Sequence, residues 1–154
     1  MKINIEALQE VKQLILEEPK RFFMEGWGFV NGVGYGIDAG DVPSDVCPPC
    51  QTAGCIAGHL VMLDNKKHNR TITSQLCSSY NYGGLILFNK PEDDFLTLEE
   101  MKIVENVFYI DKWDSPYGIK YSELSRLSPG LERRTKIAKL TADYIDYICE
   151  KYES

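Results

Sequence analysis

Residues 26–37 read Gly-Trp-Gly-Phe-Val-Asn-Gly-Val-Gly-Tyr-Gly-Ile, and they break an otherwise helical pattern. The pair Asn31-Gly32 suits a two-residue hairpin turn, in which both central residues adopt positive φ. We therefore predict a short Gly-rich β-hairpin that pairs residues 27–30 with residues 33–37. The glycines do not form a phosphate-binding loop, because no helical pattern follows them directly.

Helical patterns flank this hairpin on both sides. Before it, Asn4 is a candidate N-cap, apolar residues follow with a period of about 3.6, and Pro19 ends the pattern. Farther along, Thr97 opens a clear helix, because Glu100 three residues later completes a capping box. The expected helices cover residues 4–18, 53–63 and 97–108, with a last helix that opens at Ser128-Pro129.

The remaining segments are less regular. We expect a loop over residues 38–50 and a short helix near residues 74–79. Residues 85–88 fit either a strand or a buried turn, and residues 111–128 are expected to form an irregular connection. A chain of 154 residues fits one domain. The sequence thus predicts a mainly α fold of the α+β class, in which residues 1–154 form a single compact helical domain with a short β-hairpin.

The net charge of the chain limits the classes of partner that we expect. Seventeen Lys and Arg stand against 23 Asp and Glu, a net charge of −6. Proteins that bind nucleic acid typically carry a surplus of basic residues, so we expect this protein not to bind nucleic acid. No apolar stretch approaches the roughly 20 residues of a spanning helix, and four glutamates interrupt the first 18 residues. We expect a cytoplasmic protein with no membrane contact, as a monomer or a small homo-oligomer.

One cluster of Cys and His residues could bind a metal ion or take part in catalysis. Cys47, Cys50, Cys55 and His59 lie within 13 residues. Two Cys at x2 spacing, followed by a Cys and a His one helical turn apart, could hold a tetrahedral zinc ion. The order of ligand types differs from that of a zinc knuckle, so we expect no cofactor and keep zinc as the alternative.

Two further interpretations of this cluster stay open beside a purely structural one. Cys55 could be a nucleophile activated by the helix start, with Gln51 as oxyanion donor, although His59 on the same helix is a poorly placed base. One of the two upstream cysteines could instead pair with Cys55 as a redox switch. The structural interpretation is that Gly54 and Gly58 allow close packing, with Cys55 and His59 as core residues.

A ligand site is the interpretation that we carry forward. The helix start near Thr52 would offer free backbone N–H groups to a phosphate or carboxylate, and aromatic side chains would supply stacking surfaces. The candidate ligand-binding residues are Thr52, Gly54, Cys55, His59, Trp27, Tyr35 and Trp113.

Two segments also resemble a known pattern. Residues 15–27, from Ile-Leu-Glu-Glu-Pro to Trp27, and Cys50-x4-Cys55-Ile-Ala-Gly-His59 resemble an uncharacterised family of small bacteriophage and bacterial proteins. The family transfers no catalytic residue. It implies a phage or mobile-element accessory protein in a bacterial or infected host cell. We expect a non-enzymatic binding protein that engages a host protein or sequesters a small anionic ligand. The alternatives are a Cys-dependent hydrolase or transferase and a small structural-zinc domain.

Overall fold

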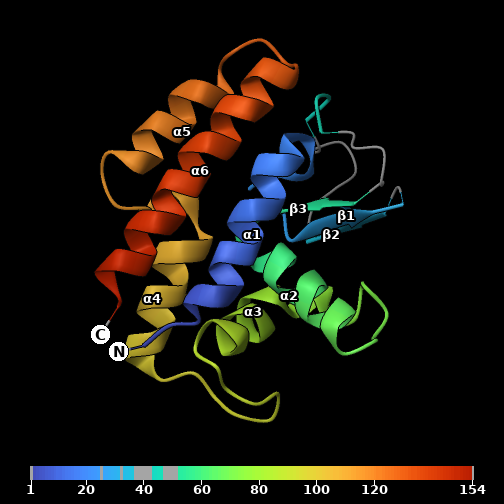
Figure 1. The fold of residues 1–154 in the computed structure, drawn as a ribbon, viewed down its shortest axis with the longest axis vertical. Helices are drawn as coiled ribbons and strands as arrows, with labels where there is room; N and C mark the ends of the chain where they lie inside the picture. The colour runs from blue at the N-terminus through green and yellow to red at the C-terminus, as the bar shows by residue number, and fades with distance from the viewer. Residues whose placement is uncertain (1, 25, 32, 37–42, 47–51, 154) are drawn as a thin grey trace.

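The computed structural model describes residues 2–24, 26–31, 33–36, 43–46 and 52–153. Its helices are α1 (Ile5–Glu17), α2 (Ile56–Lys67), α3 (Ser79–Leu87), α4 (Leu98–Phe108), α5 (Tyr117–Ser125) and α6 (Leu131–Lys151). Strands β1 (Gly28–Val30), β2 (Val33–Tyr35) and β3 (Thr52–Gly54) form an antiparallel sheet in the order β2-β1-β3 (Figure 1). The predicted mainly helical fold with a short hairpin is confirmed.

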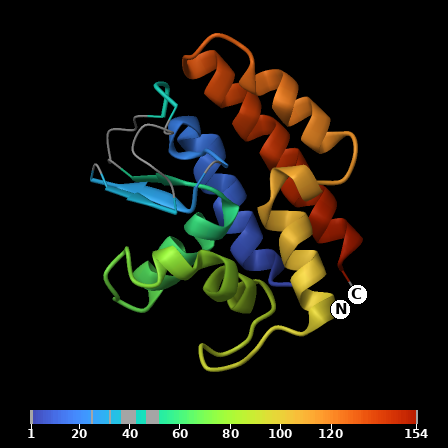
Figure 2. The ribbon, with the colours of Figure 1, turned by 180° about the vertical axis from the view of Figure 1, so that it is seen from behind.

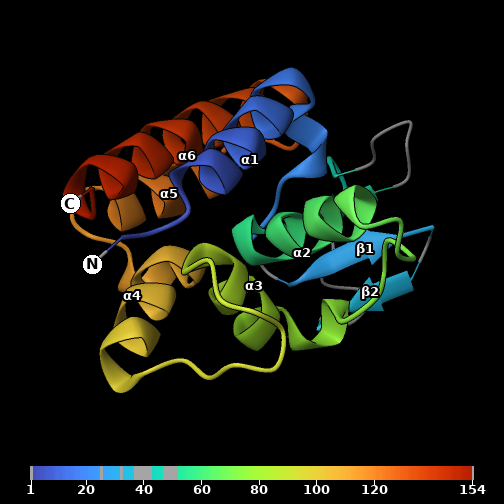
Figure 3. The same cartoon turned by 60° about the horizontal axis from the view of Figure 1, so that its bottom comes forward.

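The helices lie in two groups around a shared core. Figure 3 shows α1, α5 and α6 on one side and α2, α3 and α4 on the other, with the sheet beside α2. Seen from behind in Figure 2, the sheet occupies one end of the molecule. Apolar side chains from both groups, such as Ile15 of α1, Leu60 of α2 and Ile145 of α6, belong to one buried cluster.

The start of α2 differs from the prediction. We expected a helix from residue 53 with Thr52 as its N-cap, but the N-cap is Cys55 and the helix begins at Ile56. Residues 52–54 instead add strand β3 to the hairpin, with Gly54 opposite Gly28. This pairing is a long-range contact that competes successfully with the local helical pattern.

A close backbone approach locks α2 beneath the hairpin. A Cβ atom built on Gly58 would overlap the carbonyl oxygen of Trp27, and one built on Gly54 would lie 2.6 Å from the same oxygen. Cβ atoms do not tolerate such distances, so only glycine fits at both positions. The small residues around Cys55 therefore serve close packing.

Three other boundaries were predicted incorrectly. Residues 85–87 end helix α3, whereas we expected a strand or a buried turn at residues 85–88, and residues 117–125 form α5 within the expected irregular connection. The buried Tyr121 holds α5 in place, since its ring packs edge-on against Trp113 at a centroid distance of 5.7 Å. The last helix begins at Leu131, two residues after Pro129. For α5, tertiary packing outweighs a weak local signal.

A buried ion pair ties the loop at residues 43–46 to the start of α6. The Asp45 carboxylate accepts two hydrogen bonds from Arg133, at 2.6 and 2.7 Å, and one from Arg134 at 3.0 Å. Burial alone would raise the pKa of Asp45, but these bonds, one from the Gly130 N–H and the charge of Arg134 hold that pKa well below its ordinary value. Arg134, only 1% exposed, also donates to the Phe22 carbonyl oxygen at 3.0 Å.

Replacing Asp45 should therefore be costly. Asp45→Asn leaves Arg134 buried without its anion, and we expect the free energy of unfolding to fall by about 3–5 kcal/mol in urea denaturation. The matched control is Asp146→Asn, which breaks the exposed pair with Lys12 and should cost less than about 1 kcal/mol. Equal losses in the two variants would contradict a structural role for Asp45.

Candidate functional site

The N-terminus of α2 is capped by the thiol of Cys55. The Gly58 N–H donates to Sγ at 3.4 Å, and the thiol donates to the Trp27 carbonyl oxygen at 3.8 Å. Cys55 is 2% exposed. Its side chain thus fills the role that a Ser or Thr hydroxyl plays at other helix starts, and no open surface leads to it.

His59 lies one turn farther along the same helix and is fully buried. Its Nε2 lies 2.9 Å from the Arg21 carbonyl oxygen, so Nε2 carries a proton and donates it. Its Nδ1 makes no hydrogen bond within the part of the chain that the structure describes. Burial lowers the pKa of His59 to about 4, against the opposing effect of the Arg21 and Gly54 carbonyl oxygens. The imidazole is therefore neutral at physiological pH.

These contacts weaken the anion-binding, zinc and catalytic hypotheses that the sequence suggested. Gly58 approaches the Trp27 backbone so closely that the first turn of α2 is covered rather than open to an anion. Among the described residues, no group of three or more His, Cys, Asp or Glu side chains is placed to hold a metal ion. Cys47, Cys50 and Gln51, which the zinc and catalytic hypotheses require, lie outside the described residues.

The structure places the aromatic candidates in two settings. Trp27 is half-buried, packs against Tyr109 at a ring distance of 6.1 Å and lies, like Tyr35, beside the small cluster that contains Val30. Trp113 is 6% exposed, stacks on Tyr144 at 4.3 Å and donates from Nε1 to a backbone carbonyl. Trp113 is therefore a core residue, whereas Trp27 and Tyr35 lie next to each other at the hairpin.

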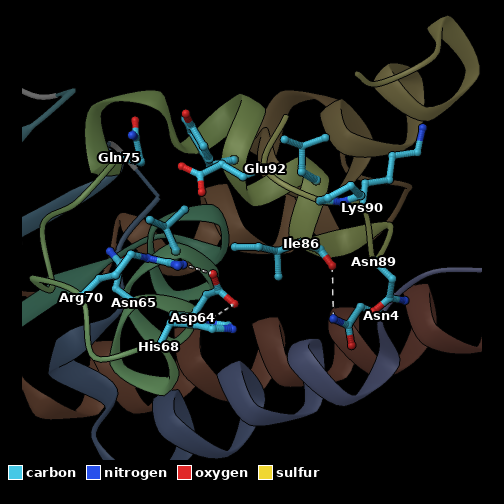
Figure 4. Close-up of a pocket in the computed structure, with 14 residues that line it drawn as sticks. Asn4, Asp64, Asn65, His68, Arg70, Gln75, Ile86, Asn89, Lys90 and Glu92 are labelled. Carbon is cyan, nitrogen blue, oxygen red and sulfur yellow. Dashed lines mark hydrogen bonds and ion pairs between the residues drawn. The ribbon is translucent and has the colours of Figure 1, made fainter. Parts of the chain in front are cut away.

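A cavity of about 380 Å³ lies at the opposite end of α2, where residues from α2, α3 and three connecting segments meet (Figure 4). Apolar side chains such as Val61, Leu85 and Ile86 line part of it, and polar side chains line the rest. The polar lining consists of Asn4, Asp64, Asn65, His68, Arg70, Gln75, Tyr82, Asn89, Lys90 and Glu92.

One wall of the cavity is an ordered polar network. Arg70 donates to Asp64 at 2.6 Å and to Asn65 at 3.1 Å. The Nδ1 atom of His68 lies 2.9 Å from the Asp64 carbonyl oxygen and therefore donates to it. The buried Asn65 also donates to the carbonyl oxygens of Ile72 and Ser74, at 2.9 and 2.8 Å. These bonds hold the segment after α2 against the helix.

The opposite wall comes from the segment between α3 and α4. Figure 4 shows Glu92 pointing into the cavity, across from Asp64 and Arg70. Lys90 turns its ammonium away, because this group bonds to the Phe95 carbonyl oxygen at 2.9 Å and to Glu100 at 2.5 Å. Within the described lining, Glu92 is thus the carboxylate whose charge no ion pair offsets.

Both α2 and α3 end beside this cavity. His68 is the C-cap of α2, and Phe88, next to Asn89, is the C-cap of α3. The helix macrodipole places partial negative charge at each C-terminal end, equivalent to about half an elementary charge. The last carbonyl groups of α2 and α3 already accept hydrogen bonds, from Arg70, Lys90 and Asn4 among others, which offsets part of this charge. The cavity therefore favours a positively charged group, in contrast to the anion expected at the other end of α2.

Sequence reasoning missed this site. Residues 64–71 are polar and turn-like in sequence, and that composition does not single out a site. The spacing of Asp64 and His68, four residues apart at a helix end, was the one local signal available, because such residues share a helix face. Asn4 and Glu92 line the cavity from segments far from α2 in the sequence, so no local pattern predicts their place in it.

Comparisons with family models, curated proteins and solved structures found no significant match to this chain. The resemblance to small phage and bacterial proteins therefore stays a prediction. Across the described residues, no helix combines the length and apolar character that crossing a membrane requires.

The burial of Cys55 predicts the order of thiol reactivity. Cys77 is exposed, whereas Cys55 and Cys149 are buried. We expect iodoacetamide to alkylate Cys77 in the native protein at least about tenfold faster than Cys55, because a buried thiol must await local opening. Peptide mass mapping over time measures both rates. Faster labelling of Cys55 would instead favour the nucleophile hypothesis.

The lowered pKa of His59 predicts a loss of stability in mild acid. Below pH 6.5 the unfolded chain binds a proton at His59 that the folded protein does not, so the free energy of unfolding falls as the pH falls toward 4. Between pH 7.5 and pH 5 the loss from this group is about 2 kcal/mol. Urea denaturation at both pH values measures it.

A His59→Gln variant is the control, since it should lose this part of the pH dependence. If the variant does not fold, NMR titration of the wild-type imidazole gives the same answer directly. A His59 pKa near its ordinary value in that titration would contradict the prediction.

Proposed function

We propose that the protein is a non-enzymatic binding protein whose cavity at the C-terminal end of α2 holds a small amphipathic cation. The observation that carries the proposal is the cavity itself, with an apolar side and a polar side that includes Asp64 and Glu92. Its volume of about 380 Å³ lies at the lower end of the range for small-molecule sites, roughly 300–1,000 Å³.

The charged groups around the cavity determine which class of ligand it favours. Arg70 offsets Asp64 and Glu100 offsets Lys90, so the carboxylate of Glu92 and the two helix ends set the local field. An ammonium or guanidinium group near Glu92 would be stabilised by all three. An aliphatic part of the same ligand would cover Val61 and Ile86, which recovers about 25 cal/mol for each Å² of apolar surface buried.

The hydrolase or transferase hypothesis has less support, because its nucleophile Cys55 is buried and already hydrogen-bonded at the helix start. The motifs that resemble small phage and bacterial proteins support an accessory role in the cytoplasm of a bacterial or infected cell. A binding protein without chemistry of its own is consistent with that role.

Two probes of equal length and opposite charge test the cavity. We expect n-butylammonium to shift the backbone NMR signals of Asp64, His68 and Glu92, with a dissociation constant on the order of millimolar for so small a ligand. Butyrate should leave these signals unchanged, because the cavity field repels it.

Two single-residue variants test whether n-butylammonium binds in the cavity. Glu92→Gln should weaken n-butylammonium binding about two- to fivefold, the range for a partly exposed ion pair. Asp93→Asn removes the same charge one residue away, outside the lining, and should leave binding nearly unchanged. Equal responses to butyrate and n-butylammonium would contradict the proposal.

A further inference from the structure

Two large apolar side chains stand out from the surface beside α4. Phe95 is 81% exposed and Leu98 is 79% exposed, the highest values for large hydrophobic residues in the part of the chain that the structure describes. Figures 1 and 2 show the segment between α3 and α4 projecting from the body of the protein. We call these two side chains the Phe95–Leu98 ridge. Burying both would recover several kcal/mol, so their exposure is a cost to the isolated protein.

The backbone under this ridge is held by specific bonds. Lys90 donates to the Phe95 carbonyl oxygen at 2.9 Å, and Asp94 accepts from the Phe95 N–H at 2.7 Å. The Thr97 hydroxyl accepts from the Glu100 N–H at 3.1 Å, while the Glu100 carboxylate accepts from the Thr97 N–H at 2.8 Å. The ridge is therefore presented in one conformation, which lowers the ordering cost of binding.

Acidic side chains border the ridge. Asp93 and Asp94 precede it, and Glu99 follows Leu98; all three residues are exposed. An apolar contact bordered by carboxylates matches a surface that is apolar at its centre and basic at its rim. The charges also oppose two other occupants, a second copy of this chain, whose net charge is −6, and an anionic lipid surface.

We propose that the Phe95–Leu98 ridge docks into an apolar groove with a Lys- or Arg-rich rim on a partner protein. Phe95 enters the groove, Leu98 packs beside it, and the carboxylates at residues 93, 94 and 99 pair with the basic rim. Buried aromatic side chains that fill a pocket on the partner are common anchors of protein interfaces.

Two synthetic peptides test this chemistry with the full chain. The first is an amphipathic 14-residue helix of Leu and Lys, and the second has Glu in place of every Lys. We expect the Leu/Lys peptide to shift NMR signals at residues 92–99 and the Leu/Glu peptide to leave them unchanged. The double substitution Phe95→Ser and Leu98→Ser should weaken binding of the Leu/Lys peptide at least about tenfold.

The control is Ile119→Ser, which removes an exposed apolar side chain, 61% exposed, on α5 and should leave binding unchanged. Because the ridge residues are exposed, the double variant should keep the wild-type melting temperature. Binding that survives the double substitution would overturn the proposal. So would shifts confined to Asp64 and His68, which would place a lysine in the cavity, or wild-type dimerisation that Phe95→Ser abolishes.

Discussion

The close approach between the Trp27 carbonyl group and the first turn of α2 is the constraint on which the rest of the structure depends. It requires glycine at positions 54 and 58, and it brings β3 into register with β1. It also buries Cys55 and His59, which looked from their spacing like functional residues. One end of α2 is closed in this way among the described residues, and the cavity for which we propose a ligand lies at the other end. The packing contact is therefore the reason why the proposed site differs from the one expected at the helix start.

The Asp45 ion pair also holds the segments around the sheet in place, through its contacts with α6. Arg134 connects the Asp45 carboxylate to the Phe22 carbonyl oxygen, so α6 holds both the loop before β3 and the segment before β1. Burying three charged groups is expensive, and it is tolerated here because Arg133 and Arg134 together occupy both carboxylate oxygens. The pair therefore fixes a geometry more than it adds stability.

Local signals were enough to predict part of this fold. The turn at Asn31-Gly32 and the capping box at Thr97 both depend on residues within a few positions of each other, and the hairpin and α4 follow them. The start of α2 depends instead on pairing with β1, far away in sequence, and α5 depends on burial of Tyr121. The cavity needs Asn4 and Glu92 to meet around α2, a contact that no periodicity reveals. Burial of Cys55 and His59 agrees with the structural interpretation of that segment.

Lys90 joins the cavity to the Phe95–Leu98 ridge. Its side chain lines the cavity, while its ammonium group bonds to the Phe95 carbonyl oxygen beneath the ridge. Under the two proposals, the segment that carries Lys90 is both a wall for a small ligand and the support for a protein contact. A ligand that moves this wall would also move the ridge, and linkage requires the coupling free energy to be the same in both directions. Under both proposals, occupation of the cavity would be transmitted mechanically to the partner protein at the ridge.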